Sequence, residues 1–477
     1  MQERVDVAII GGGPAGIFAA FELLTRREGL RVVMLEAGAD LAERSCPIAE
    51  RKVTRCVGCV PCDIMRGFGG AGAFSDGKYN LTTEFGGWLQ EFLPEQDVLE
   101  LIEYVDSINL QFGAPRELYT TKGSALRKQA LAFDLHLLHA TVRHLGTENN
   151  LRILGELHRF LFSQLGMHFN SPVTKIEPQD GGFRLTVAPH SESPRTVFAD
   201  FVIAAPGRAG AEWFTAQCKA LGLSLYNNQV DVGVRVELPY EIFSHITDEV
   251  YEAKLVYRTK QYGDSVRTFC MNPHGFVVTE NTDGIITVNG HSFRDPALHS
   301  RNTNFALLVS NRFTHPFNEP HQYGKRIASF SNMLGGGALV QRFGDLVRGR
   351  RTNEHRLGQC FTKPTLAATP GDLSLVLPKR HLDNIIEMIY ALDKLAPGTA
   401  NDDTLLYGVE VKFYSSRLRL SPELETDVKG LFAVGDGAGV TRGLSQASAS
   451  GVHVGRVLAT RHAKPKAESG KPLVHDA

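Results

Sequence analysis

Four of the seven cysteines lie close together in the first part of the chain. Cys56, Cys59 and Cys62 form a C-x-x-C-x-x-C run, and Cys46 precedes this run by ten residues. Thiolates separated by two residues can converge on one metal, and this set suits an iron–sulfur cluster or, as the second choice, zinc. A redox-active thiol pair beside a bound cofactor, or free thiols without function, are the other two interpretations.

A second group of residues, near the N-terminus, can hold phosphates. Gly11, Gly13 and Gly16 follow a short apolar run in G-x-G-x-x-G spacing. The first glycine allows a tight turn, the second lets backbone approach a pyrophosphate, and the third lets a helix pack on the strand. Pro14 and Ala15 open that helix, whose free N–H groups favour phosphate. We expect all five residues to bind a dinucleotide.

Two further fragments complete this site. Glu36 ends a second apolar run 20 residues past Gly16, where a carboxylate can accept a hydrogen bond from a ribose 2′-OH. The same carboxylate would repel a 2′-phosphate, so FAD or NAD fits. About four hundred residues later, GLFAVGD is another apolar run that ends on Gly435 and Asp436. Together the fragments predict one nucleotide site built from both ends of the chain.

The late fragment resembles a known motif. Thr426 and the GLFAVGD run are similar to the C-terminal flavin motif of the glutathione reductase-like FAD superfamily. The resemblance implies that Asp436 binds the ribitol of FAD. It also implies that Gly207, after the apolar run 201–205, lies where the chain passes the flavin, and that Val173 lies beside the adenine. FAD is therefore the expected cofactor, and NAD is the alternative.

The stretch that follows the cysteines is rich in glycine. Four glycines in six consecutive positions exclude a regular helix and permit close backbone approach to a flat ligand. We expect Gly70 and Ala71 to contact the cofactor. Ser75, Asp76 and Lys78 are candidate catalytic residues that contact the flavin or the substrate.

The segment after the Gly-Asp pair carries the last candidates. Gln446 and Ala447 begin an expected helix whose N–H groups would lie near the flavin. Arg442 is a candidate catalytic charge that stabilises reduced flavin, and a solvated arginine at a helix start is the alternative. Arg235 and His291 are weaker candidates for substrate ligands, since structural histidines are more common.

These residues must be positioned by elements that the hydrophobic pattern predicts. We expect an α/β protein with a glutathione reductase-like Rossmann FAD-binding domain and an inserted α+β substrate domain. The FAD-binding domain comprises residues 1–210 and 405–462, the substrate domain 211–404, and a disordered tail 463–477. The predicted helices are 97–112, 125–145, 385–395 and 445–458, and the predicted strands include 183–187, 196–204, 231–237, 254–257, 276–279 and 284–288.

The net charge and the hydrophobic pattern limit the classes of molecule that the protein is expected to bind. A net charge of -1 over 477 residues gives no general attraction to nucleic acid or an anionic membrane. No apolar run approaches the ~20 residues of a membrane helix, and no cleavable leader is visible. We expect a cytoplasmic protein. A second glycine fingerprint is absent from the sequence, so NAD(P)H would visit transiently, or a ferredoxin-like protein would donate electrons.

Several blocks together resemble a bacterial family of FAD-dependent dehydrogenases, the uncharacterised NAD/FAD-utilising dehydrogenases. The blocks are RKVTRCVGCVPCDIMRGFGGAGAFSDGKYN, DVGVRVE, VNGHS and LFAVGDGAGVTRGLSQASASG. The resemblance implies an oxidoreductase that passes a hydride or electrons between flavin and a small-molecule substrate, with the cysteine-bound cluster as a further carrier. A redox sensor, or a flavoprotein that modifies a macromolecule, is the alternative. Aromatic hydroxylation is less favoured because prolines do not follow the Gly-Asp pair closely.

Overall fold

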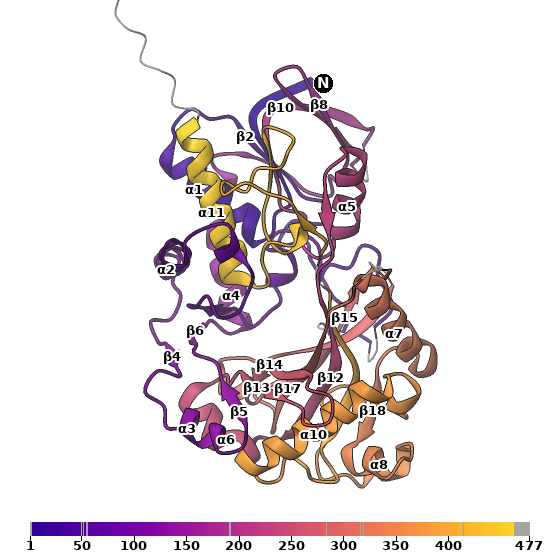
Figure 1. Cartoon of the computed structure of the whole chain (residues 1–477). Coiled ribbons are helices and arrows are strands. Elements are labelled where there is room, and N and C mark those ends of the chain that lie inside the picture. The colour runs from indigo at the N-terminus through magenta and orange to yellow at the C-terminus, as the bar shows by residue number, and fades with distance from the viewer. Residues whose placement is uncertain are drawn as a thin grey trace, which may run out of the picture.

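The chain forms two layered parts, one above the other in Figure 1. The computed structural model describes residues 2–48, 50, 52–53, 56–189, 192–282, 284–314, 316–317, 319–413 and 415–461. The predicted tail, 463–477, lies outside the described residues. Each part is built on its own sheet, so the architecture is mixed α and β.

The first sheet has the strand order β7-β2-β1-β10-β9-β8, with β22 also paired to β10. Strands β7, β2, β1, β10 and β22 pair with one another in parallel, whereas β9 is antiparallel to both β10 and β8. The bounds are β1 (Gln2–Ile10), β2 (Val32–Leu35), β7 (Gly166–His168), β8 (Val173–Gln179), β9 (Gly182–Val187), β10 (Arg195–Ala204) and β22 (Leu431–Ala433). Parallel strands bring their carboxyl ends to one edge, where an α/β sheet binds its ligand.

Helices from the two ends of the chain pack on each other beside this sheet. Helix α1 (Pro14–Arg26) and helix α11 (Leu444–Arg461) lie together in Figure 1, with α5 (Ala211–Ala220) on the other side. A Cβ on Gly451 would lie 2.0 Å from the carbonyl oxygen of Ala15, so only glycine permits this approach. The close contact holds the late Gly-Asp segment against the early glycine fingerprint.

The second sheet has the order β19-β18-β20-β12-β17-β14-β13-β5. In its central strand β12 (Val230–Pro239) the valines alternate with Asp231, Arg235 and Glu237, yet all of these side chains are buried. The apolar face packs on helices α6 (Tyr240–Val250) and α10 (Lys379–Leu395). The charged face is turned toward the first part. The other bounds are β5 (Leu135–Leu137), β13 (Leu255–Arg258), β14 (Ser265–Asn272), β17 (Asn302–Asn311), β18 (Leu339–Arg342), β19 (Thr369–Pro370) and β20 (Leu405–Phe413).

Smaller elements join the two parts. A hairpin of β15 and β16, the pair β11 and β21, and the small sheet β3-β6-β4 lie between or beside the main sheets. These strands are β3 (Lys78–Asn80), β4 (Tyr119–Thr120), β6 (Thr141–His144), β11 (Leu225–Tyr226), β15 (Phe276–Thr282), β16 (Ile285–His291) and β21 (Arg417–Leu418). The remaining helices are α2 (Glu95–Gln111), α3 (Leu126–Leu131), α4 (Thr147–Phe162), α7 (Pro320–Gly335), α8 (Phe343–Val347) and α9 (Glu354–Gly358), and the 3-10 turns are η1 (Gly70–Gly72), η2 (Leu89–Glu91), η3 (Pro296–Leu298), η4 (Leu373–Leu375) and η5 (Asp436–Ala438).

One predicted helix is wrong. Residues 125–145 form α3, then β5 and β6, instead of one helix. Asp134 has a positive φ of 61°, which ends the helical path, and β5 pairs with the edge strand β13. Pairing with a distant strand therefore overrides the helical spacing of the apolar residues. Helix α4, just beyond, was not predicted.

Two strands of the second sheet come from outside the range 211–404. Strand β5 precedes residue 211 and strand β20 follows residue 404, yet both pair within the second sheet. The second sheet therefore draws on chain from both sides of the predicted insert. Within the described ranges, none of the helices is sufficiently long and apolar to cross a membrane.

Candidate functional site

A cavity of about 690 Å³ lies between the two sheets. One wall consists of the glycine fingerprint, the 65–78 stretch and the segment around Asp436. The other wall comes from the charged face of the second sheet. Such a cavity, with walls from two parts of a chain, is where cofactors and small molecules usually bind.

The glycine fingerprint lies at the carboxyl end of β1. A Cβ on Gly11 would lie 2.2 Å from the carbonyl oxygen of Ala205, because β1 and β10 run side by side there. Helix α1 begins directly afterwards with Pro14 at its first turn. Gly11, Gly13, Pro14 and Ala15 line the cavity, so the helix N-terminus is available to a phosphate.

Glu36 holds this corner together through backbone donors. Its Oε2 accepts a hydrogen bond from the N–H of Gly12 at 2.6 Å, and Oε1 accepts from Gly38 at 2.8 Å and Gly67 at 3.0 Å. The carboxylate therefore joins the fingerprint to the glycine-rich stretch and also lines the cavity. Val173 and Gly207, the predicted adenine and flavin neighbours, line the same cavity.

The turn η1 lies opposite the start of α1. The N–H of Gly69 donates to the carbonyl of Gly12 at 2.8 Å. The side-chain amide of Asn150, on α4, donates to the carbonyls of Gly72 at 2.7 Å and Ser75 at 3.2 Å and so fixes the shape of the stretch. Gly70, Ala71 and Ser75 line the cavity. Sequence reasoning missed Asn150, since its helix was not predicted.

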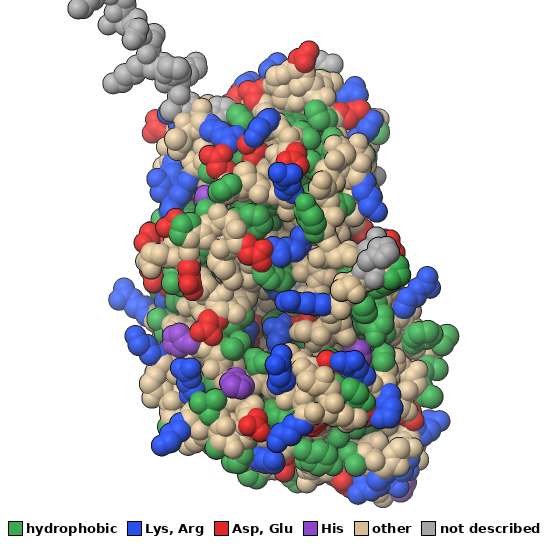
Figure 2. Space-filling view, viewed as in Figure 1, with side chains coloured by type: hydrophobic (Ala, Val, Ile, Leu, Met, Phe, Trp, Pro, Cys, Tyr) green, Lys and Arg blue, Asp and Glu red, His purple; other side chains and the backbone are tan. Residues whose placement is uncertain are grey.

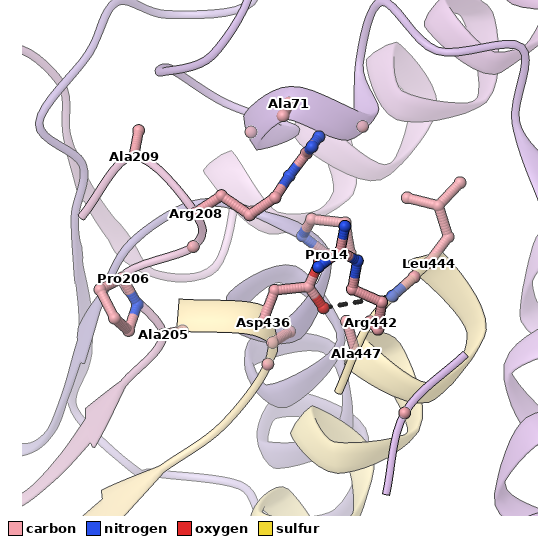
Figure 3. A pocket seen from close by; sticks show the side chains of 18 of the residues that line it. Pro14, Ala71, Ala205, Pro206, Arg208, Ala209, Asp436, Arg442, Leu444 and Ala447 are labelled. Carbon is pink, nitrogen blue, oxygen red and sulfur yellow. Dashed lines mark hydrogen bonds between the residues drawn. The ribbon is translucent and has the colours of Figure 1, made fainter. Parts of the chain in front are cut away.

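The Gly-Asp segment forms the end of the cavity drawn in Figure 3. Asp436 Oδ1 accepts hydrogen bonds from Thr441 Oγ1 at 2.8 Å and from the N–H of Gly443 at 3.2 Å. Arg442 lies beside it, and its Nη1 donates to the carbonyl of Phe413 at 2.8 Å. Arg208 extends toward the turn that carries Ala71. Gly435, Asp436, Arg442 and Ala447 line the cavity, and their contact with a ligand stays a prediction.

Gln446 lies behind this wall. Its Oε1 accepts a hydrogen bond from the N–H of Leu89 at 3.2 Å, and its Nε2 donates to the carbonyl of Phe85 at 3.4 Å. The side chain is buried at the start of α11 and is not among the residues that line the cavity. It fixes the 85–89 segment, so its expected cofactor contact stays a prediction.

Lys78 and Asp76 are buried side by side in the cavity wall. Lys78 Nζ lies 3.1 Å from Asp76 Oδ2 and 3.6 Å from Glu252 Oε2, and donates to Asn272 Oδ1 at 2.8 Å. Burial alone lowers the pKa of Lys78, but Asp76, the nearby Cys270 and Glu252 outweigh it and raise the pKa. Lys78 is therefore a fixed cation at neutral pH.

Hydroxyl and imidazole groups continue from Asp76 into the protein. Ser292 Oγ lies 3.4 Å from Asp76 Oδ2 and 2.7 Å from the hydroxyl of Tyr251, which lies 2.9 Å from His144 Nε2. Burial lowers the pKa of His144 to about 4, so its imidazole is neutral at pH 7. The connected groups can redistribute a proton near Asp76.

The second sheet supplies cations that the sequence did not single out. Lys254, Arg267 and Lys412 line the cavity around the ring of Phe269, which lines it too. Their positively charged groups lie 4.8, 5.2 and 5.6 Å from the centre of that ring. A signal existed for Lys412, because charged residues alternate with valines in GVEVKF, but which face of the strand meets the cavity depends on distant strand pairing.

Two weaker sequence candidates lie away from the cavity lining. Arg235 is fully buried, and its guanidinium donates to Asn304 Oδ1 at 2.9 Å and pairs with Glu410 at 3.2 Å. His291 Nδ1 lies 3.4 Å from Thr147 Oγ1. These contacts stabilise the interface between the hairpin, α4 and the second sheet.

The four clustered cysteines do not form a metal site in this geometry. Cys59 is exposed, whereas Cys46, Cys56 and Cys62 are partly buried. Burial raises the pKa of Cys62, and the charges of Cys56 and Cys46 raise it further. In the part of the chain that the structure describes, no three histidine, cysteine, aspartate or glutamate side chains converge as metal ligands would. An iron–sulfur cluster or zinc is therefore not supported.

Comparison with known proteins adds a family match for the second part. Residues 229–413 match a family described as FAD-dependent protein, C-terminal domain-like. This range covers the central strands of the second sheet, including β20. An uncharacterised protein of Clostridium beijerinckii is 27% identical, over 96% of this chain and 81% of its own length.

Solved structures align with this chain at low sequence identity and low TM-score. Quinol-fumarate reductase FrdA of E. coli aligns with a TM-score of 0.43 and 14% identity, over 97% of this chain and 71% of its own. Glycine oxidase of Geobacillus kaustophilus aligns with a TM-score of 0.40 and 14% identity, over 96% of this chain and 95% of its own. A geranylgeranyl bacteriochlorophyll reductase-like protein of Thermoplasma acidophilum aligns with a TM-score of 0.42 and 13% identity, over 96% of this chain and 79% of its own. Similarities of this size do not identify the reaction of this chain.

Proposed function

We propose that the protein is an FAD-dependent oxidoreductase that acts on a small molecule in the cavity between its two sheets. The observation that carries this proposal is that both ends of the chain line one cavity, from Glu36 and Val173 to Asp436 and Arg442. The match of residues 229–413 to an FAD-dependent family supports it independently.

The residues present fit an extended dinucleotide of the glutathione reductase-like type. The N-terminus of α1 and the turn η1 would receive the pyrophosphate between two backbone surfaces that lack side chains. Glu36 would accept a ribose hydroxyl beside the backbone donors it already binds. Asp436, held by Thr441 and Gly443, would accept hydroxyls of the ribitol.

When bound, FAD would supply the two-electron chemistry of the reaction. The chain would bind and orient the reactants, and its buried polar groups would carry the transferred proton. Lys78 stays charged, and its Nζ lies 3.1 Å from Asp76 Oδ2. From Asp76, the hydroxyl groups of Ser292 and Tyr251 continue as a hydrogen-bonded path along which a proton from the substrate would move. Ser75 and Arg442 would orient ligands from the two neighbouring segments.

The test is a purified protein with its flavin content and its reductants measured. We expect a yellow protein with one FAD per chain, whose flavin absorbance bleaches anaerobically with NADH, NADPH or a reduced ferredoxin and returns with a substrate. A colourless protein that does not take up added FAD would contradict the proposal. A bound flavin that none of these donors reduces would favour the alternative, a redox sensor or a macromolecule-modifying flavoprotein.

A further inference from the structure

The three cations on the second sheet form an anion-receiving wall. The ammonium groups of Lys254 and Lys412 and the guanidinium of Arg267 are grouped around the ring of Phe269. Like charges this close repel one another, and burial makes the repulsion stronger. The pKa of Lys254 is lowered, mainly by burial and, against the opposing effect of Glu252, by the charge of Arg267. An anion bound here would remove part of this cost.

The counter-charges of this wall lie mostly behind it. Arg267 pairs with Asp231, and Lys412 Nζ lies 2.7 Å from Glu410 Oε1. Both carboxylates are fully buried and neither is among the cavity-lining residues, whereas their cations are. Glu410 is also shared with Arg235 at 3.2 Å. Glu252 is the exception, because it lines the cavity beside Lys254. Around Arg267 and Lys412, the surface that a ligand meets is cationic and the carboxylates lie beneath it.

Lys254 is positioned for a ligand by aromatic rings. Its ammonium lies 3.8 Å from the centre of the Phe85 ring and 4.8 Å from that of Phe269, and Glu252 Oε1 lies 3.4 Å away. The rings hold the charge without using its N–H groups as conventional hydrogen bonds do. Glu252 is shared with Lys78 at 3.6 Å, so it does not serve Lys254 alone.

This concentration of cations is not part of a charged outer surface on the face shown. Figure 2 shows acidic and basic side chains interspersed over that face of the molecule. The whole chain carries a net charge of -1. A cationic wall inside a nearly neutral protein is selective, because it attracts an anion to one place.

We propose that the cavity takes a small organic carboxylate, whose carboxylate group is received by Lys254, Arg267 and Lys412. The planar fork of Arg267 matches the two oxygens of a carboxylate. With Arg235, which shares Glu410, four cations lie among three carboxylates, Asp231, Glu252 and Glu410. The excess is one positive charge, which suits a singly charged group better than a dianionic phosphate. The inference rests on the proposed function insofar as this carboxylate would be the molecule that the flavin oxidises or reduces.

The test compares carboxylates with their neutral amides by isothermal titration calorimetry. The probes are benzoate, benzamide, succinate, succinamide and inorganic phosphate, each titrated into FAD-loaded and FAD-stripped protein. We expect at least one carboxylate to bind at least about tenfold more tightly than its amide. If neither carboxylate binds more tightly than its amide, or if phosphate binds more tightly than both, the proposal is overturned.

Two variants locate the binding. Lys412→Met removes one cation while Arg235 still pairs with Glu410, so the sheet should fold. We expect it to weaken carboxylate binding about tenfold. The double variant Lys254→Met with Glu252→Gln removes a cation and its counter-charge together and should do the same. Lys379→Met, an exposed lysine on α10, makes the same charge change as Lys412→Met and should leave the affinity unchanged.

The outcomes separate this inference from the proposed function. If carboxylate binding depends on Lys412 but the protein does not bind FAD, the anion site is supported and the proposed flavin function is contradicted. If the protein binds FAD but wild type and Lys412→Met bind the carboxylate equally tightly, the proposed flavin function is supported and the anion site is contradicted.

Discussion

The two walls of the cavity are built from different materials. The nucleotide wall is mostly backbone, with glycines where a side chain would collide and a helix that starts at the cavity. The opposite wall consists of side chains, with arginine, phenylalanine and lysine projecting from β14 and β20 and Lys254 from the residue directly before β13. A backbone wall suits a ligand with invariant phosphates, whereas a side-chain wall can be altered residue by residue for a different substrate. Four experiments probe this difference.

The largest effect is expected where the backbone wall is filled. Gly11→Ala would place a Cβ 2.2 Å from the carbonyl oxygen of Ala205 at a φ of +107°. We expect a loss of about 4 kcal/mol of unfolding free energy, measured in urea, together with loss of FAD. The matched control is Gly29→Ala, which has a positive φ but no atom within 4 Å, and should cost about 1–2 kcal/mol. Equal losses would show that contact with β10 is unimportant.

The second-largest effect is expected when the buried arginine behind the side-chain wall, Arg235, is replaced. Arg235→Met leaves Glu410 with Lys412 as its cation and removes the hydrogen bonds to Asn304. We expect a loss of about 3 kcal/mol in urea unfolding with little change in FAD affinity. Arg380→Met, which breaks an exposed pair with Asp264, should cost less than about 1 kcal/mol. Loss of FAD in the first variant would mean that the two walls are not separable.

The third experiment addresses the contact between the chain and the flavin. Asp436→Ala removes the carboxylate that faces the cavity and should weaken FAD binding by about 2 kcal/mol while the protein stays folded. Asp436→Asn keeps an oxygen for Thr441 and Gly443 and should lose less. Flavin absorbance after gel filtration measures both. Full FAD occupancy in the alanine variant would contradict the assigned role.

The smallest effect is a pH dependence at the junction of the walls. His144 has a pKa of about 4 in the folded protein, against 6.5 for an ordinary histidine, because it is buried. The unfolded chain therefore binds the extra proton first, and stability falls as the pH drops from about 6.5 toward 4. Between pH 7.5 and 5 we expect wild type to lose about 1–2 kcal/mol more than His144→Asn. Parallel losses in the two proteins would contradict the low pKa.

Sequence reasoning succeeded where function depends on local backbone geometry. The strand, turn and helix around Gly11 and the strand before Asp436 were predicted, and the structure places both at one cavity. It failed where distant pairing decides. The pairing of β5 overrides the helical spacing of 125–145. Nothing in the local sequence shows that Lys254, directly before β13, and Lys412, on β20, meet at the same cavity wall. The cysteine run shows the opposite error, because regular spacing in the sequence did not bring the thiols together.

The strand β5 has a consequence for how the molecule comes apart. Its three residues leave the first part of the chain and seal the outer edge of the second sheet beside β13. A fragment cut at residues 211 and 404 would lack both this seal and β20, so it would expose unpaired strand edges and tend to aggregate. The second sheet thus depends on strands from both sides of its main segment, and we expect the two parts to unfold in one thermal transition rather than two.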